Sequence, residues 1–288
     1  IYKYNNATRY DACEENSMNQ KIKNEKLQSL CEQLNDMSLS ERIDAISCVN
    51  KLTTLDYEEE EISIVCNSET ELHTRARSCA KEPETIDWLK LYFKEDSVLY
   101  DIGANIGAYS LVAGKMNDKG LIFSFEPGYA SFSSLISNIN INELTDRIMP
   151  ISMAVSNNNS LDYFNYVTNE AGCASNSFGE SIDYLGNQFV PHYKQMISSM
   201  TLDSVIDFIE PPTMIKIDVD GIEDKIIEGA RKTLTEGNVE TVLVELVDGD
   251  DDRAKSVLSN MELYGYKIDS VHPYKGVSST SNYIFVKK

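Results

Sequence analysis

The sequence predicts an α/β fold in which helices cover both faces of a mostly parallel sheet. From Pro83 onward, apolar runs of about five or six residues alternate with segments of helical periodicity. Such runs are typical of parallel strands buried on both faces, because each crossover places a helix over the sheet. The last two runs, 266–270 and 282–286, are joined by a short polar loop and predict a C-terminal antiparallel hairpin.

Two helices are expected before this region. Leu27, Leu30 and Leu34 recur at spacings of three and four, which predicts an amphipathic helix from about residue 18 to 37. A second helix is expected to start at Ser38 and to continue to about residue 52. The leucine stripe must be buried, either against the core or against a second subunit. A homo-oligomer formed through these helices is therefore one expectation.

The remaining elements follow from the same two periodicities. Helices are expected at residues 83–93, 106–116, 129–141 and 222–234. Strands are expected at residues 61–66, 97–102, 120–125, 147–153, 214–219, 241–246, 266–270 and 282–286.

The charge balance excludes some classes of partner. The chain has 26 Lys and Arg against 46 Asp and Glu, a net charge of −20. A surface this acidic repels phosphate backbones and anionic lipids, which argues against a general nucleic-acid binder. No apolar stretch approaches the length of a membrane-spanning helix.

The six cysteines and three histidines are scattered along the chain. No two cysteines form a C-x-x-C pair, so a zinc site is not indicated. A chain of this length does not need disulfides, and its start carries no secretory signal. We therefore expect reduced thiols and a cytoplasmic location.

A glycine turn after a buried strand carries the most information about chemistry. The segment Asp101-Ile-Gly-Ala-Asn-Ile-Gly107 joins that strand to an apolar helix. In open parallel sheets, ligands bind beyond the carboxyl ends of the strands, and the first strand–helix turn is the usual place. Gly103 and Gly107 let a ligand approach the backbone. Their G-x-x-x-G spacing differs from the G-x-G-x-x-G of dinucleotide-binding turns.

Two acidic residues indicate the kind of ligand. Asp101 would repel a pyrophosphate but suits a ligand that carries an ammonium or sulfonium group. Glu126 lies at the tip of the next strand, 19 positions after Gly107, where it is placed to accept both ribose hydroxyls. A nucleoside with a positive tail and no phosphates is favoured, and S-adenosylmethionine fits that description. The alternative is that the glycines only close a tight turn and that Glu126 is a solvated strand end.

The ordered motifs of the chain resemble those of the FkbM-type S-adenosylmethionine-dependent methyltransferases. Besides the glycine turn, they include Lys81-Glu-Pro-Glu-Thr85, Phe125-Glu-Pro127, Thr201-Leu-Asp203 and Ile215-Lys-Ile-Asp-Val-Asp-Gly-Ile-Glu223. The resemblance implies a Rossmann-like, seven-stranded methyltransferase sheet. It implies a methyltransferase domain at residues 81–288, preceded by an N-terminal helical or accessory segment at residues 1–80. The cofactor contacts that we expect are Glu82, Thr85, Asp101, Gly103, Ala104, Asn105, Gly107, Glu126, Pro127 and Asp218.

Three residues are candidates for the catalytic step. Residues 215–220 alternate strictly, so Asp218 should emerge beside Lys216 at the carboxyl edge of a central strand, close to the cofactor's methyl group. Glu245 ends the next buried strand and should lie near Asp218. It is either a general base or a partner that neutralises Lys216. His272, in the loop between the last two strands, is the third candidate base.

The segment from Asp218 to Gly221 resembles part of a calcium loop. In an EF-hand its first and last ligands would fall on Lys216 and Ile227, which do not bind calcium. We therefore expect no metal. A looser metal site that uses Asp218, Asp220 or Glu223 is the alternative.

These observations predict a methyltransferase that uses S-adenosylmethionine. Members of the family commonly methylate hydroxyl groups, so the expected acceptor is a hydroxyl of a sugar, a glycan or a natural product. The alternatives are a nucleic-acid or other small-molecule methyltransferase, a nicotinamide oxidoreductase, and a non-catalytic assembly module that keeps the fold. The sequence lacks the basic stripe that a nucleic-acid methyltransferase would carry and the G-x-G-x-x-G of a nicotinamide oxidoreductase. It retains the glycine turn and its acidic residues, which a non-catalytic assembly module would lose.

Overall fold

The structure is a computed structural model that describes residues 25–49, 51–249, 251–274 and 279–288. The chain divides into two compact units, Ile1–Lys51 and Leu52–Lys288. In the first unit the structure describes helix α2 (Glu25–Asp36) and helix α3 (Leu39–Ser47). Residues 18–24, the expected start of the first helix, lie outside the described residues.

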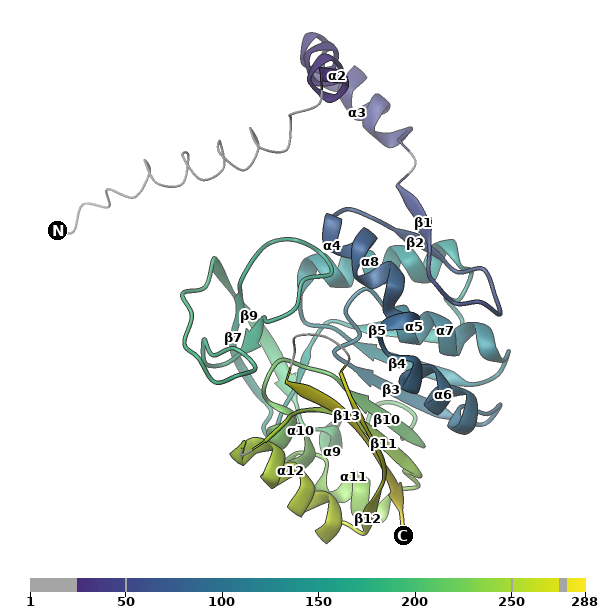
Figure 1. Cartoon of the computed structure of the whole chain (residues 1–288), viewed down its shortest axis with the longest axis vertical. Coiled ribbons are helices and arrows are strands. Elements are labelled where there is room, and N and C mark those ends of the chain that lie inside the picture. The colour runs from purple at the N-terminus through teal and green to yellow at the C-terminus, as the bar shows by residue number, and fades with distance from the viewer. Residues whose placement is uncertain (1–24, 50, 250, 275–278) are drawn as a thin grey trace, which may run out of the picture. The chain divides into compact units, whose positions relative to one another are not determined.

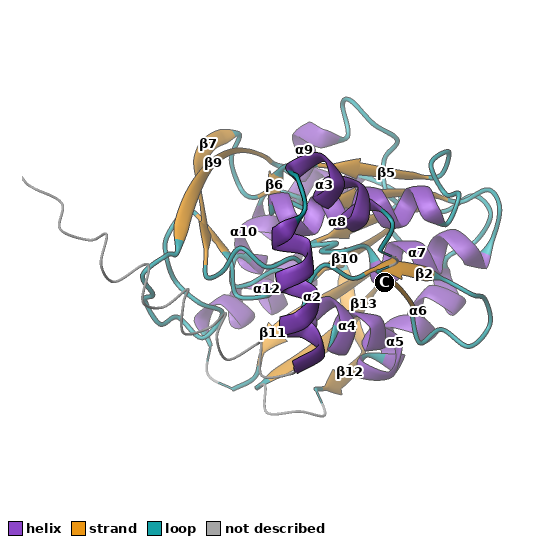
Figure 2. Ribbon diagram, turned by 90° about the horizontal axis from the view of Figure 1, so that it is seen from above, coloured by secondary structure: helices purple, strands orange, loops and turns teal. Residues whose placement is uncertain are grey.

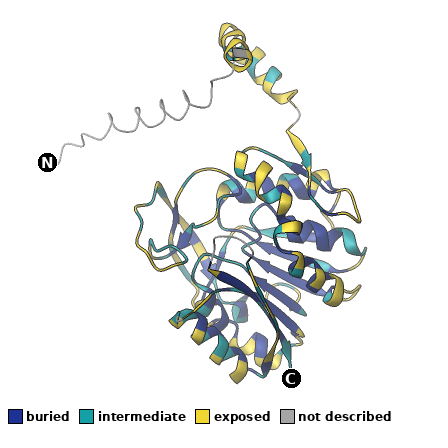
Figure 3. Cartoon of the chain, in the orientation of Figure 1, coloured by how far each residue is buried: buried dark blue, intermediate teal, exposed yellow. Residues whose placement is uncertain are grey.

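Both N-terminal helices are confirmed over the described residues, but the second ends at Ser47 and does not reach residue 52. Leu52 instead begins a short strand and pairs with Val65. Ser38 caps α3, because its side chain accepts a hydrogen bond from the Glu41 N–H while the Glu41 carboxylate accepts one from the Ser38 N–H. Both helices are exposed over most of their length (Figure 3). Leu27 is 48% exposed and Leu30 is 51% exposed. The first unit therefore does not bury the leucine stripe by itself, and self-association through it stays a prediction.

The second unit is built on a seven-stranded sheet with helices on both faces (Figures 1 and 2). The strand order is β12-β13-β11-β10-β3-β4-β5. Strand β13 runs in the opposite direction to the other six strands. The expected α/β class, the mostly parallel sheet and the C-terminal hairpin are thus confirmed. The strands are β3 (Val98–Ile102), β4 (Leu121–Phe125), β5 (Ile148–Ile151), β10 (Met214–Ile217), β11 (Thr241–Val247), β12 (Tyr266–Pro273) and β13 (Thr280–Lys287).

Each central strand contributes side chains to two separate cores, one on each face of the sheet. Leu99 packs into the core under the first set of helices, and its neighbour Tyr100 packs into the core under the second set. The first set is α5 (Ser78–Lys81), α6 (Pro83–Tyr92), α7 (Ala108–Met116) and α8 (Tyr129–Ile141). The second set is α9 (Leu202–Val205), α10 (Glu223–Glu228), α11 (Arg231–Glu236) and α12 (Asp252–Leu263).

A short hairpin joins the main unit before the expected domain boundary. Strand β1 (Leu52–Thr54) pairs with β2 (Ser63–Val65), and α8 holds β2 in place. Asn138 accepts the Val65 N–H at 2.8 Å, and Asn142 accepts the Ser63 N–H at 2.9 Å. The connection to α5 contains α4 (Glu69–His73) and the 3₁₀ turn η1 (Arg75–Arg77). The boundary expected between residues 80 and 81 therefore falls inside the compact unit.

A second sheet, which the sequence does not predict, lies beside the central one (Figure 1). Its strands are β6 (Ala154–Val155), β7 (Ser160–Tyr166), β8 (Ser177–Phe178) and β9 (Tyr193–Met200), in the order β6-β9-β7-β8. We call this sheet and its connections the arm. Its own core is small, with Phe164, Tyr166 and Ile197 among the few buried apolar side chains. Because few of its side chains are buried, the arm does not need the continuous apolar runs that predict the strands of the central sheet.

Two helical predictions need correction. Residues 222–234 form two short helices rather than one, because the chain turns at Gly229, where a Cβ would lie 2.3 Å from the Ser156 carbonyl oxygen. Helix α12 was not among the expected helices, and it begins at the last residue of the acidic run Asp248–Asp252. Asp251 in that run caps the helix by accepting hydrogen bonds from the Arg253 and Ala254 N–H groups.

No helix among the described residues has the length and apolar character needed to span a membrane. The described cysteines Cys31, Cys48, Cys66, Cys79 and Cys173 are all free thiols, and Cys13 lies outside the described residues.

We predict that a chain beginning at Leu52 folds as the full chain does, whereas a chain beginning at Glu82 is strongly destabilised. The longer deletion removes Leu55, Ile62 and Ile64, which are at most 2% exposed in the first core. Each lost side chain of this kind costs about 2–5 kcal/mol. Thermal unfolding of both chains checks this. Equal melting temperatures for the chains beginning at 52 and 82 would contradict it.

Candidate active site

The glycine turn that follows β3 is clamped between the ends of two neighbouring strands. Gly103 and Ala104 both donate their backbone N–H groups to the Phe125 carbonyl oxygen at 3.0 Å. Gly103 has φ = 83°, and a Cβ there would lie 2.0 Å from the Asp218 carbonyl oxygen. Only glycine fits this close approach of two backbone segments.

Gly107 serves the packing of helices, in contrast to the expected approach of a ligand. It has φ = 89°, and a Cβ there would lie 2.4 Å from the Leu135 side chain of α8. Asn105, between the two glycines, has φ = 52° and donates its side-chain amide to the Cys173 carbonyl oxygen at 3.2 Å. The turn thus connects α8 and the arm to the end of β3.

A cavity of about 200 Å³, here called the main cavity, opens at this turn. Its lining includes Gly103, Asn105, Glu126, Pro127, Asp218 and Glu245, together with Arg75 and Lys81. The structure thus brings together five of the ten expected cofactor contacts and two of the three catalytic candidates. The remaining cofactor candidates Glu82, Thr85, Asp101, Ala104 and Gly107 do not line it.

Glu126 is buried at the end of β4 and is held by backbone groups. Its two carboxylate oxygens accept the Gly128 N–H at 2.6 Å and the Asn105 N–H at 2.9 Å. Burial raises the pKa of Glu126 to about 7, against these hydrogen bonds, which lower it. Both oxygens are therefore fixed in position at the wall of the main cavity.

Asp101 lies beneath the turn and not in the cavity. It is 1% exposed and accepts a hydrogen bond from the Ser110 hydroxyl at 2.5 Å. Burial raises its pKa, although the nearby Lys216 lowers it. In the parallel register Asp101 pairs with Lys216 of β10. Asp101 therefore supports the turn from within the core.

The buried Lys216 and the half-buried Asp218 form an ion pair at the edge of the sheet. The Lys216 ammonium lies 2.6 Å from the Asp218 carboxylate and 4.7 Å from the centre of the Tyr109 ring. Burial raises the pKa of Asp218, but the charges of Lys216 and Lys81 lower it more. The pKa of Asp218 therefore falls from its ordinary value to about 2. The prediction that Lys216 and Asp218 share one side is confirmed.

Glu245 lies beside Asp218, as the sequence predicts. Val244 of β11 pairs with Ile217 of β10, so the next residue of each strand reaches the same edge. Burial raises the pKa of Glu245 to about 8, and the charge of Asp218 adds to this. Glu245 accepts a hydrogen bond from the Thr280 hydroxyl at 3.2 Å.

His272, Glu82 and Thr85 are among the candidates that do not line the main cavity. His272 belongs to strand β12, not to the expected loop, and pairs with Asn282 of β13. Glu82 is 3% exposed and forms an ion pair with Lys81 at 2.7 Å. Thr85 is fully buried on α6. Among the described residues no group of three or more His, Cys, Asp or Glu is arranged to hold a metal ion.

Two smaller cavities adjoin the main one. The apolar slot, about 40 Å³, is lined by Phe125, Met153, Phe164 and Ile222, and it shares Gly103 with the main cavity. The side cavity, about 180 Å³, shares Lys81, Ala174, Asp220 and Glu245 with the main cavity and is further lined by Ser175, Tyr184, Tyr274 and Thr280.

Comparison with known proteins identifies the family. The model of the methyltransferase FkbM domain matches residues 101–268. The chain belongs to the FkbM methyltransferase family. The resemblance noted in the motifs is thereby confirmed.

Individual relatives of this FkbM methyltransferase are distant. The hexuronic acid methyltransferase AglP of Haloferax volcanii is 26% identical over 180 residues, 62% of this chain and 67% of that protein. Methyltransferase FkbM of Methylobacillus flagellatus is 19% identical with a TM-score of 0.45, over 66% of this chain and only 44% of that chain. The structure of M. jannaschii TYW2 in complex with AdoMet is 12% identical with a TM-score of 0.42, over 83% of this chain and 88% of that chain.

Arg75 also lines the main cavity, and sequence patterns do not identify it. Its Nε donates to the Gly172 carbonyl oxygen at 2.7 Å, and the residue lines the main cavity. It lowers the pKa values of Glu126, Asp218 and Asp220, yet it forms no ion pair among the described residues. Arg75 precedes the motifs of the FkbM family in the sequence, so only folding reveals its place.

We predict that the methyltransferase loses stability as pH rises from about 4.5 to 8. Five of the described carboxyl groups have raised pKa values in the folded protein: Asp101, Asp220 at about 6, Glu126 at about 7, and Glu223 and Glu245 at about 8. Their unfolded values are 3.8 for Asp and 4.5 for Glu. The folded state therefore binds more protons across this window, and the free energy of unfolding falls as those protons leave.

Melting temperatures measured at about pH 6 and pH 8.5 check this, with Glu245→Gln as the matched variant. The wild type should melt at a lower temperature at the higher pH, and the variant should show a smaller drop. A wild type that becomes more stable towards pH 8.5 would contradict the prediction.

Proposed function

We propose that the main cavity and the apolar slot bind S-adenosylmethionine. Glu126 presents two fixed carboxylate oxygens, which suit the two hydroxyls of a ribose. The bare backbone of Gly103 lets a ligand lie against the turn. The apolar slot next to Gly103 suits a flat purine ring.

The charged residues of the main cavity suit the amino-acid part of the same molecule. Asp218, with a pKa of about 2, is ionised at neutral pH and suits an ammonium group. Arg75 has its Nε engaged by Gly172, which leaves the two terminal nitrogens of its planar group for a carboxylate. When bound, S-adenosylmethionine supplies a methyl carbon whose bond to a sulfonium sulfur breaks, with the electron pair staying on the sulfur.

We further propose that the acceptor is a hydroxyl group of a carbohydrate. Family membership and the sugar named for the Haloferax volcanii relative support this acceptor. The net charge of −20 argues against nucleic acids. The side cavity, which adjoins the main cavity at Glu245, offers room for such an acceptor.

Glu245 is a better candidate for the proton acceptor than Asp218. The O-methylation proposal rests on the position of Glu245 between the two cavities. It lines both the main and the side cavity, whereas Asp218 lines only the main one. In its ionised form, a carboxyl group with a pKa of about 8 is a far stronger base than one with a pKa of about 2. Glu245 takes the proton that the acceptor hydroxyl loses as its oxygen bonds to the methyl carbon.

Binding of S-adenosylhomocysteine and of 5′-methylthioadenosine, which lacks the amino-acid part, separates the roles of Glu126 and Arg75. We predict that Glu126→Gln weakens the binding of both ligands by about 1–3 kcal/mol, because both contain the ribose. Arg75→Gln should weaken only the binding of S-adenosylhomocysteine. Titration calorimetry measures all four affinities, with the exposed Arg77→Gln as control. No heat from either ligand with the wild type, but clear binding of a nicotinamide dinucleotide, would refute the cofactor proposal.

Glu245→Gln and Asp218→Asn should differ in their kinetics. We predict that Glu245→Gln lowers turnover by about 10²–10⁴-fold and leaves the affinity for S-adenosylhomocysteine close to unchanged. Asp218→Asn should lower that affinity together with the rate. Methyl transfer and calorimetry measure both effects, and Glu240→Gln, an exposed residue near the start of β11, is the control. Full turnover by Glu245→Gln would rule Glu245 out as the proton acceptor.

A further inference from the structure

The side cavity has two aromatic walls. Tyr184 of the arm and Tyr274 at the end of β12 both line it, and both are half-buried. Tyr274 donates its backbone N–H to the Thr280 carbonyl oxygen at 2.9 Å, and the Thr280 side chain in turn donates to Glu245. One wall is thus tied to the same edge of the sheet as Glu245.

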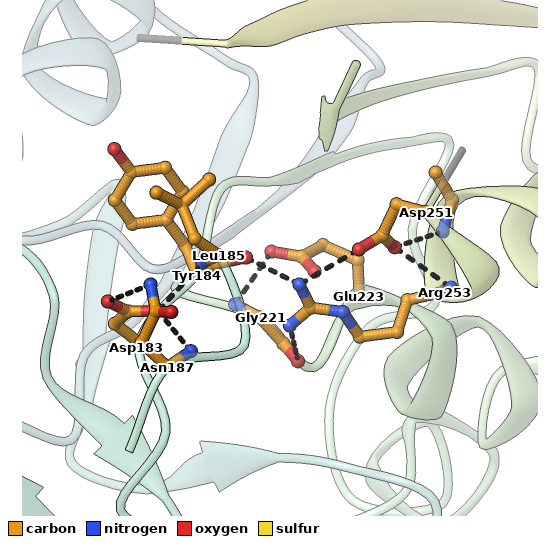
Figure 4. A network of polar contacts seen from close by, with 9 residues as sticks. Asp183, Tyr184, Leu185, Asn187, Gly221, Glu223, Asp251 and Arg253 are labelled. Carbon is orange, nitrogen blue, oxygen red and sulfur yellow. Dashed lines mark hydrogen bonds and ion pairs between the residues drawn. The ribbon is translucent and has the colours of Figure 1, made fainter. Parts of the chain in front are cut away.

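The second wall is held by a polar network centred on Arg253 of α12 (Figure 4). The Arg253 guanidinium group donates to the carbonyl oxygens of Tyr184 and Gly221 and forms an ion pair with Asp251 at 3.2 Å. The Tyr184 ring points away from this group (Figure 4). A Cβ at Gly221 would lie 2.6 Å from the Arg253 side chain and 3.5 Å from the Tyr184 Cα. The arm is therefore fixed against the turn that follows Asp218.

The charges around the side cavity are unbalanced. Asp220 and Glu245 contribute two carboxyl groups, and Lys81 contributes the cation that lines the cavity. The Lys81 ammonium is already committed, because it lies 2.7 Å from Glu82 and 5.2 Å from the centre of the Tyr274 ring. Near neutral pH Asp220, with a pKa of about 6, is mostly ionised, whereas Glu245, with a pKa of about 8, mostly holds its proton. A ligand with a carboxylate would therefore meet the negative charge of Asp220 beside a cation that is engaged elsewhere.

We propose that the side cavity is the acceptor site and that it takes an uncharged sugar, not a sugar acid. The faces of a neutral sugar ring are largely C–H and pack on the tyrosine rings, while its hydroxyls meet Asp220, Ser175 and Glu245. The reacting hydroxyl lies at Glu245, where the side and main cavities meet. This inference rests on the proposed function and names the class of acceptor for it.

Matched pairs of methyl glycosides test the inference. Methyl glucoside, mannoside and galactoside are each compared with the corresponding methyl uronide, by ligand-detected NMR on protein saturated with S-adenosylhomocysteine and by transfer of labelled methyl. We expect at least one neutral glycoside to bind at least about tenfold more tightly than its uronide and to accept the label, given the energy of a nearby unpaired like charge. Asp220→Asn should reduce the ratio of the two affinities, because it removes a negative charge that repels the uronide.

Tyrosine variants test the location of the site. Tyr184→Ala and Tyr274→Ala should each weaken the binding of the neutral glycoside by about tenfold, while the affinity for S-adenosylhomocysteine, which also reports folding, stays unchanged. Tyr129→Ala is the control, because Tyr129 is 46% exposed and belongs to a different aromatic group beside β9. Loss of glycoside binding in Tyr129→Ala alone would move the acceptor site to that surface and overturn the inference.

Failure of this inference is separable from failure of the proposed function. Protein that binds S-adenosylhomocysteine but prefers a uronide, or that binds none of the neutral glycosides, overturns the inference alone. Protein that does not bind S-adenosylhomocysteine overturns the proposed function itself.

Discussion

A buried lysine organises the carboxyl edge of the central sheet. Lys216 is 1% exposed, and the removal of an ammonium group from water is costly unless other charges compensate. Burial lowers its pKa, but Asp218 and Asp101 raise it more, so the lysine stays charged. The end of β10 is thereby tied to the end of β3, and the glycine turn must pass within contact of the Asp218 backbone. The main cavity exists because these segments meet there.

The same arrangement gives neighbouring carboxyl groups different properties. Asp218 takes the nearest cation and keeps a pKa of about 2, whereas Glu245, one strand away, meets burial and the charge of Asp218 and has a pKa of about 8. Environments that separate the pKa values of two acids commonly separate their roles. One acid is suited to hold a positive charge and the other to accept a proton.

The central sheet and its glycine turn could be predicted because each rests on local chemistry. A strand buried on both faces needs a continuous apolar run, and a turn with positive φ at Gly103 needs glycine, so both leave a signal in the sequence. The arm leaves a weaker signal, because its strands are half-exposed and its core is small. The sequence also did not predict that Gly107 packs against Leu135, which lies 28 residues away in α8, or that Asp101 accepts a hydrogen bond from Ser110 of the following helix.

The sequence by itself determined the fold class, the family and the acids at the ends of β3, β4, β10 and β11. It did so because strand periodicity and glycine spacing are properties of neighbouring residues. Only the tertiary structure decided that Arg75 lines the main cavity, that His272 does not, and that Tyr184 and Tyr274 both line the side cavity. These relations depend on how the arm and the segment before α6 fold back over the sheet, and contacts between segments so distant in the chain leave no local pattern.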